Sequence, residues 1–147
     1  MRIRGHWRDG GATLDLGPAP GPAGAGAVPG APAGAPVEVP AEVRAEVRVE
    51  VAASYAARTR GLLGRDGIDG AMLLTPAASV HTFRMRFAID VAYLDRRLRV
   101  IALTTMPPGR LGLPRLRSRH VLEAEAGAMA AWGLRVGSTL RVRLDSR

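Results

Sequence analysis

The sequence predicts an α+β fold, a compact and mostly antiparallel β sandwich or barrel-like domain with two short helices. The clearest strand is residues 43–51, where Val or Ala occupies every odd position and a charged residue every even one. Such period-two alternation is typical of a strand with one buried face and one face in water. Shorter apolar or alternating segments recur between turn residues, namely residues 71–75, 80–95, 98–105, 120–124 and 138–144. No segment predicts the longer helices that connect parallel strands in doubly wound folds.

The chain divides by composition into three parts. Residues 1–16 alternate loosely around Asp9-Gly10-Gly11, which predicts an N-terminal hairpin that packs on the main domain. Residues 17–36 are almost entirely Gly, Ala and Pro, with too little apolar surface to offset the entropy of ordering, so a disordered insertion is expected. Residues 37–147 then form the main domain, because a chain of 147 residues is within the size of one domain.

Both predicted helices have recognisable sequence signals. Ser54 is a good N-cap for a helix over residues 55–63 that stops near Gly64. Residues 126–132 form a small Ala-rich helix that is followed by a Gly. Gly61 lies inside the first pattern, where it costs about 1 kcal/mol relative to Ala. A Gly at such a position indicates the close approach of another backbone or of a ligand.

The net charge of +8 comes from arginine alone, because none of the 21 basic residues is Lys. Arg, Ala, Gly and Pro all have codons rich in G and C, so genome composition explains the charge as well as nucleic-acid binding does. The absence of Cys excludes disulfides, thiolate metal sites, iron–sulfur clusters and a Cys nucleophile. No run approaches the ~18 apolar residues of a membrane span, and the N-terminus lacks the apolar core of a secretion signal. We therefore expect a cytoplasmic protein without membrane contact.

His81 and Asp90 are polar residues set among apolar neighbours, which makes them candidates for a functional role. The His81 side chain is a candidate general base, because a histidine titrates near neutral pH. An unpaired carboxylate is costly to bury, so Asp90 needs a partner, either Arg60 or Arg84 or a set of backbone N–H groups. The two residues are nine positions apart and would face opposite sides of one straight strand, so catalysis by this pair requires a bend in the chain.

The remaining His and Glu residues do not form a metal-binding pattern. His120 and Glu123 are three positions apart and lie on opposite faces of their predicted strand. The motifs His-x-His and His-Glu-x-x-His do not occur in the sequence. No metal site and no cofactor are therefore expected.

Short motifs follow one another in a characteristic order. They are Arg60-Gly61-Leu62-Leu63-Gly64-Arg65, His81-Thr82-Phe83-Arg84-Met85, Ile89-Asp90-Val91-Ala92-Tyr93-Leu94-Asp95, Val121-Leu122-Glu123 and Gly133-Leu134-Arg135-Val136-Gly137. Through this order, over residues 46–144, the chain resembles the DUF192 family, also known as the uncharacterised protein family UPF0127. The resemblance implies a compact β-rich domain and no established activity. Residues 17–36 are not part of the family pattern. Ser138 stands where the family often has an acidic residue, so a site that relies on that carboxylate is not expected here.

We expect a non-catalytic binding module for a small ligand or a protein partner, present as a monomer. The expected binding rim surrounds the His-Thr-Phe-x-Met motif and comprises Arg60, Gly61, His81, Thr82, Met85, Asp90 and Glu123. One alternative is an enzyme of unknown reaction that uses His81 with Asp90. A second, less favoured alternative is nucleic-acid binding through two basic segments, with Arg96, Arg97, Arg110, Arg115, Arg117 and Arg119.

Overall fold

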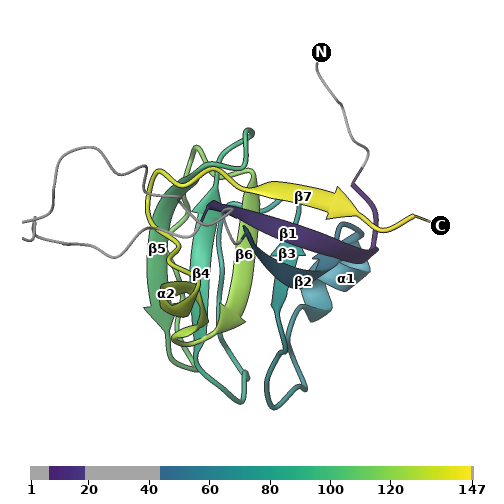
Figure 1. Cartoon of the computed structure of the whole chain (residues 1–147). Helices are drawn as coiled ribbons and strands as arrows, with labels where there is room; N and C mark the ends of the chain where they lie inside the picture. The colour runs from purple at the N-terminus through teal and green to yellow at the C-terminus, as the bar shows by residue number, and fades with distance from the viewer. Residues whose placement is uncertain (1–6, 19–43, 147) are drawn as a thin grey trace, which may run out of the picture.

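The computed structural model describes residues 7–18 and 44–146, which form a seven-stranded sheet with two short helices (Figure 1). The strand order is β5-β4-β6-β3-β2-β1-β7, and among these described strands only β2 and β3 are parallel neighbours. The strands are β1 (Gly10–Pro18), β2 (Arg44–Ala52), β3 (Ala71–Leu74), β4 (Ile89–Leu94), β5 (Val100–Met106), β6 (His120–Glu125) and β7 (Arg141–Leu144), and the helices are α1 (Tyr55–Arg60) and α2 (Ala128–Ala131). The predicted fold class is confirmed. In the described part of the chain, no helix has the length and apolar character needed to cross a bilayer.

The sheet is strongly curved, so that its two edge strands meet near their first residues. β4, β5 and β6 stand nearly upright in Figure 1, and β1 and β7 run across them. The Val100 N–H donates to the Ser138 carbonyl at 2.8 Å, and the Gly137 N–H donates to the Val100 carbonyl at 2.8 Å. These bonds join the start of β5 to the segment before β7. The described residues therefore form one barrel-like curved sheet, which stays open along the rest of both edges.

Both faces of the sheet are covered, so the interior strands β4 and β6 are buried almost throughout. The first face lies under α2 and carries the cluster Ala12, Leu14, Val47, Val49, Val51, Ala71, Leu73, Ala92, Leu94, Val100, Leu122, Ala124, Met129, Leu134 and Leu140. The second face lies under the turn after α1 and the loop before β4, and carries Ala52, Leu62, Met72, Val80, Met85, Ile89, Val91, Tyr93, Met106 and Val121. Because side chains alternate along each strand, neighbouring residues of β4 serve different cores.

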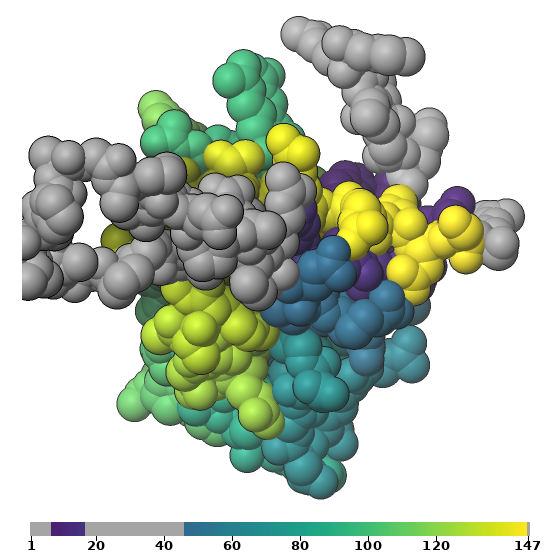
Figure 2. Space-filling view, viewed as in Figure 1, coloured from purple at the N-terminus to yellow at the C-terminus, as the bar shows by residue number. Residues whose placement is uncertain are grey.

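Residues 10–18 form the strand β1 inside the sheet. β1 pairs with β2 on one side and with β7 on the other, and Figure 2 shows the C-terminal strand packed against it. Gly10 and Gly11 belong to this strand, so the predicted turn at these residues is wrong. Gly17 and Pro18 end the strand, so the sheet extends two residues into the predicted insertion. Residues 1–6 and 19–43 lie outside the described residues, and the predicted domain boundaries stay predictions.

Residues 80–88 form a loop, although the sequence predicts a strand there. His81 makes a single antiparallel bridge with Leu111. Arg84 has a φ of 62°, which is the left-handed region and interrupts an extended strand. The strand-like segment predicted over residues 80–95 is therefore only partly right, since its one long strand is β4.

The start of α1 is fixed by side chains, as its sequence predicts. The Ser54 hydroxyl accepts a hydrogen bond from the Ala57 N–H at 3.1 Å, which is the expected N-cap contact. Asp9 adds a second anchor, because its carboxylate accepts from the Ser54 hydroxyl at 2.5 Å and from the Ala53 N–H at 2.7 Å. The helix ends at Gly61, which has a φ of 45° and donates its N–H to the Ala57 carbonyl at 2.9 Å. The helix is thus shorter than predicted, because Gly61 adopts a conformation that ends it.

Candidate ligand-binding pocket

A cavity of about 360 Å³ lies on the second face of the sheet. Its walls are α1 with the turn that follows it, and residues 76–81 of the loop after β3. Five of the seven predicted rim residues line this cavity, namely Arg60, Gly61, His81, Met85 and Glu123. The structure therefore brings together most of the site that the sequence predicts, from three separate parts of the chain.

Glu123 is the most unusual side chain of the cavity, because it is a buried carboxyl group. It lies on β6 opposite Val91 of β4 and Met72 of β3, and its side chain therefore shares the apolar second face. Only 5% of the residue is exposed. Among the described residues no group hydrogen bonds to its carboxylate. Burial raises the pKa of Glu123 to about 7, so the group exchanges its proton near neutral pH.

Arg58 supplies a cationic group that is not among the predicted rim residues. One of its terminal nitrogens, Nη1, donates to the Pro76 carbonyl at 3.1 Å. Its Nε is buried and has no acceptor among the described residues. The missed signal is the spacing within the helix predicted over residues 55–63. There Tyr55, Arg58, Thr59 and Leu62 follow the i, i+3, i+4, i+7 pattern of one face, and all four line the cavity.

His81 lies at the mouth of the cavity and is exposed. Its ring stacks on Phe83, with the ring centroids 5.3 Å apart and the planes 23° from parallel. His120 lies elsewhere, on the opposite face from Glu123 as strand parity predicts, where its Nδ1 is 2.7 Å from the Thr75 hydroxyl. Within the described residues, no group of three or more His, Asp or Glu side chains could hold a metal ion.

Thr82 is a predicted rim residue that the structure places in the packing of a loop. It is fully buried. Its hydroxyl donates to the Pro107 carbonyl at 2.7 Å and accepts from the Arg110 N–H at 2.9 Å. Thr82 therefore holds the loop after β5 against the loop before β4, and it does not line the cavity.

Replacing Thr82 with Val is expected to lower the free energy of unfolding by about 2 kcal/mol, because the Pro107 carbonyl and the Arg110 N–H lose a buried partner while the side-chain shape is kept. Urea denaturation measures the change. Thr104→Val is the matched control, since no side-chain hydrogen bond of Thr104 is found in the described structure. Equal stability of the two variants would contradict this role of the hydroxyl.

Asp90 is also a predicted rim residue, and it faces the other side of the sheet. One carboxylate oxygen accepts from the Thr105 hydroxyl at 2.7 Å. The other accepts from the N–H groups of Gly127 and Met129 at 2.9 and 3.1 Å, at the start of α2. Of the partners considered from the sequence, backbone N–H groups are therefore the ones used, and neither Arg60 nor Arg84 bonds to it. Asp90 does not line the cavity that contains His81.

The sequence profile of DUF192, a family described as "Uncharacterized ACR", matches residues 37–142. The chain belongs to the DUF192 family. A UPF0127 protein of Pyrococcus horikoshii is 42% identical over 50 residues, which are 34% of this chain and 44% of the relative. A UPF0127 protein of Pyrococcus furiosus is 36% identical over 63 residues, which are 43% of this chain and 54% of the relative. The DUF192 chain thus spans about half the length of the curated relatives that it matches.

Two crystal structures share the fold of this DUF192 protein. One is a protein of unknown function from Novosphingobium aromaticivorans, with a TM-score of 0.60 and 22% identity, covering 67% of this chain and 76% of that chain. The other is a candidate transcription regulator from Sinorhizobium meliloti, with a TM-score of 0.61 and 16% identity, covering 91% of this chain and 95% of that chain. At these identities the likeness shows the fold alone.

Proposed function

We propose that this DUF192 protein is a binding module for a small ligand, held in the cavity between α1 and residues 76–81. The buried carboxyl group of Glu123 carries this proposal. A buried polar group without a hydrogen-bond partner costs free energy, and a bound ligand that donates a hydrogen bond to it relieves that cost. The ligand therefore carries an N–H or O–H donor at the end that meets Glu123.

The other walls of the cavity narrow the ligand class. Arg58 and Arg60 line the same space as Glu123 and favour a carboxylate or another anionic oxygen on the ligand. Leu62, Leu74 and Met85 add apolar walls. A volume of about 360 Å³ suits a compact molecule. A small zwitterion or amide with an apolar part, such as a free amino acid, combines these features.

A second candidate function is acid–base catalysis in the same cavity. It is favoured by the pKa of Glu123, which burial raises to about 7, the range in which a carboxyl group can both accept and donate a proton. His81 lines the cavity as well, and its imidazole is the candidate for the second acid–base group. This candidate replaces Asp90 by Glu123 as the carboxylate that acts with His81.

We expect free amino acids with apolar side chains, or their amides, to raise the melting temperature of the wild-type protein. Glu123→Met keeps the size of the side chain and removes the carboxyl group, so it should bind the best of these compounds about tenfold more weakly or worse. Thermal shift followed by calorimetric titration measures both effects.

Glu125→Gln serves as the control for this experiment, because Glu125 is an exposed residue at the end of the same strand. Equal affinity of wild type, Glu123→Met and Glu125→Gln would contradict the proposed binding site. Turnover of a bound compound by the wild type, lost in Glu123→Gln while binding persists, would favour the catalytic candidate.

A further inference from the structure

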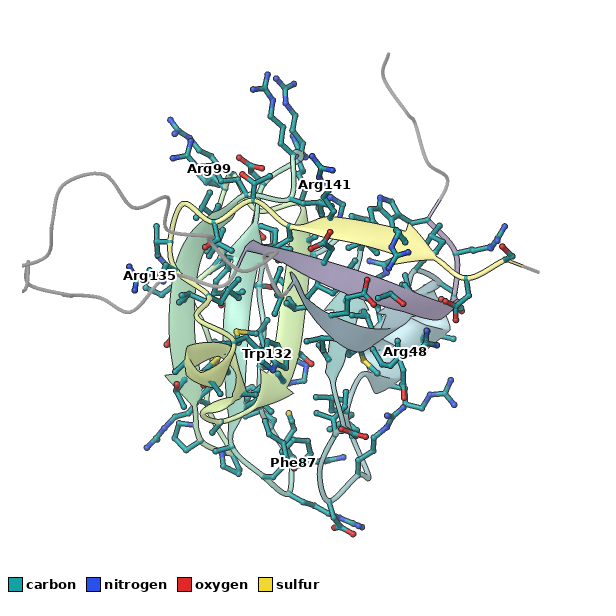
Figure 3. All side chains as sticks on the ribbon, in the orientation of Figure 1. Arg48, Phe87, Arg99, Trp132, Arg135 and Arg141 are labelled. Atoms are coloured by element: carbon teal, nitrogen blue, oxygen red, sulfur yellow. The ribbon has the colours of Figure 1, made fainter. Side chains whose placement is uncertain are left out.

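Two arginine runs that are separate in the sequence line one surface groove of about 600 Å³. Arg96, Arg97 and Arg99 come from the turn between β4 and β5, and Arg117 and Arg119 come from the loop before β6. A backbone hydrogen bond fixes the two segments together, because the Arg119 N–H donates to the Leu94 carbonyl at 2.7 Å. All five arginines are exposed. In Figure 3, Arg99 lies at the upper left of the view and Arg48 lies on the right, lower down.

The positive charge of this arginine groove is not neutralised within the described structure. Asp95 is the one acidic residue that lines it, and its carboxylate accepts from the backbone N–H groups of Arg97 and Arg99 at 2.8 and 3.1 Å. No described acidic side chain forms an ion pair with the five guanidinium groups, whereas Arg48 and Arg143 pair with Asp145 and Glu46. Five unpaired like charges around one groove attract anions.

An exposed apolar side chain stands at the edge of the arginine groove. Leu116 is 96% exposed. It also borders a second hollow of about 670 Å³, where Ile101 and Val136 form part of an apolar wall. The turn that carries it is anchored, since the Arg115 N–H donates to the Ala78 carbonyl at 2.8 Å and the Ser118 hydroxyl donates to the Ala77 carbonyl at 3.0 Å. The chain therefore holds Leu116 outward among the arginines.

We propose that the arginine groove binds the phosphodiester backbone of a nucleic acid, with Leu116 in contact with sugars or bases. The groove is open and continues past Leu116 into the second hollow, which suits an extended polyanion better than a compact anion. Arginine pairs with phosphate oxygens through two parallel hydrogen bonds, and apolar side chains such as Leu pack against bases. Arg110, which the sequence grouped with these arginines, lines neither hollow. The proposal is independent of the Glu123 cavity.

An anionic membrane is the competing partner for a surface of arginine and leucine. Leu111 and Leu113 are exposed on the same loop, but neither lines the groove or the second hollow. Leu116 is thus the one strongly exposed Leu that borders the arginine groove in the described structure. Contacts to a phosphodiester backbone need no further apolar surface on the protein. Insertion into a bilayer, in contrast, becomes stronger as more apolar surface is buried.

The test is fluorescence anisotropy with labelled single-stranded and duplex oligonucleotides over a series of salt concentrations. The wild type should bind with an affinity that falls steeply as salt rises, because arginine–phosphate contacts release counterions. The full-length double variant Arg97→Ala/Arg117→Ala should bind about tenfold more weakly, and its salt slope should fall by roughly 0.7 to 0.9 for each phosphate that the variant no longer binds. Leu116→Ala should weaken binding without changing the salt slope.

The double variant Arg48→Ala/Arg143→Ala is the matched control, because it loses the same two positive charges outside the groove. Thermal denaturation of all variants verifies that they are folded. No oligonucleotide binding at low salt, or equal weakening by groove and control variants, would overturn the proposal. Flotation with phosphatidylserine vesicles at the same salt tests the membrane, and vesicle binding without oligonucleotide binding would also overturn it.

Discussion

The wild-type protein is expected to lose stability relative to Glu123→Gln as the pH rises from about 4.5 to about 7. In the folded protein, burial raises the pKa of Glu123 from 4.5 to about 7. Between these pH values the folded state keeps a proton that the unfolded state has released, so deprotonation favours unfolding. The difference of about 2.5 pH units between the two pKa values corresponds to roughly 3 kcal/mol at pH 8. Gln carries no charge at any of these pH values and avoids this loss.

Urea denaturation at several pH values checks this prediction through the difference between wild type and variant. Other titrating groups cancel in that difference. Burial lowers the pKa of His120, for example, and this makes both proteins gain stability as the pH rises towards 6.5. Glu125→Gln is the control, and its free energy of unfolding should change with pH in the same way as that of the wild type. A pH-independent gap between wild type and Glu123→Gln would refute the raised pKa.

Replacing Asp90 with Ala is expected to lower the free energy of unfolding by about 3 kcal/mol or more. The residue is only 6% exposed, and its carboxylate accepts three hydrogen bonds, from Thr105, Gly127 and Met129. A hydrogen bond to a charged group contributes about 1.5 to 3 kcal/mol, and its loss leaves donors buried without a partner. Gly127, at the start of α2, has no side chain to cap the helix, so Asp90 performs this role from β4. Asp90→Asn keeps the shape of the side chain and one acceptor oxygen, so its free energy of unfolding should lie between those of Asp90→Ala and the wild type.

Chemical denaturation gives the global effect, and hydrogen exchange of the Gly127 and Met129 amides gives the local one. Asp69→Ala is the control, because Asp69 is exposed and forms no hydrogen bond in the described structure. It should change stability by less than about 0.5 kcal/mol. Equal stability of Asp90→Ala and Asp69→Ala would contradict this capping role of Asp90.

Local patterns in the sequence predict much of this fold. The alternation of residues 43–51 corresponds to β2, and Ser54 caps α1 as expected. These predictions succeed because side-chain alternation and capping depend on neighbours within a few residues. Parity also places His120 and Glu123 on opposite faces correctly. Five of the predicted rim residues line the cavity, and all five lie in the motifs that carry the resemblance to DUF192.

Long-range pairing explains the errors. Gly10 and Gly11 have the composition of a turn, but their segment is extended because β2 and β7 bind it from both sides. The loop at residues 80–88 has the hydrophobicity of a strand, yet Thr82 bonds to Pro107 and Arg110 instead of to a neighbouring strand. Neither partner can be identified from a single sequence, because strand pairing has no fixed separation along the chain.

The sequence by itself determined the α+β class, the strongest strand, the first helix cap and the residue types of the candidate site. The tertiary structure alone decided what those residues can do. Glu123 has a raised pKa because α1 and residues 76–81 cover its strand and remove water, and no local pattern encodes that cover. The two arginine runs act as one surface because the Arg119 N–H bonds to the Leu94 carbonyl. Desolvation and charge density depend on distances in space, and the fold sets those distances.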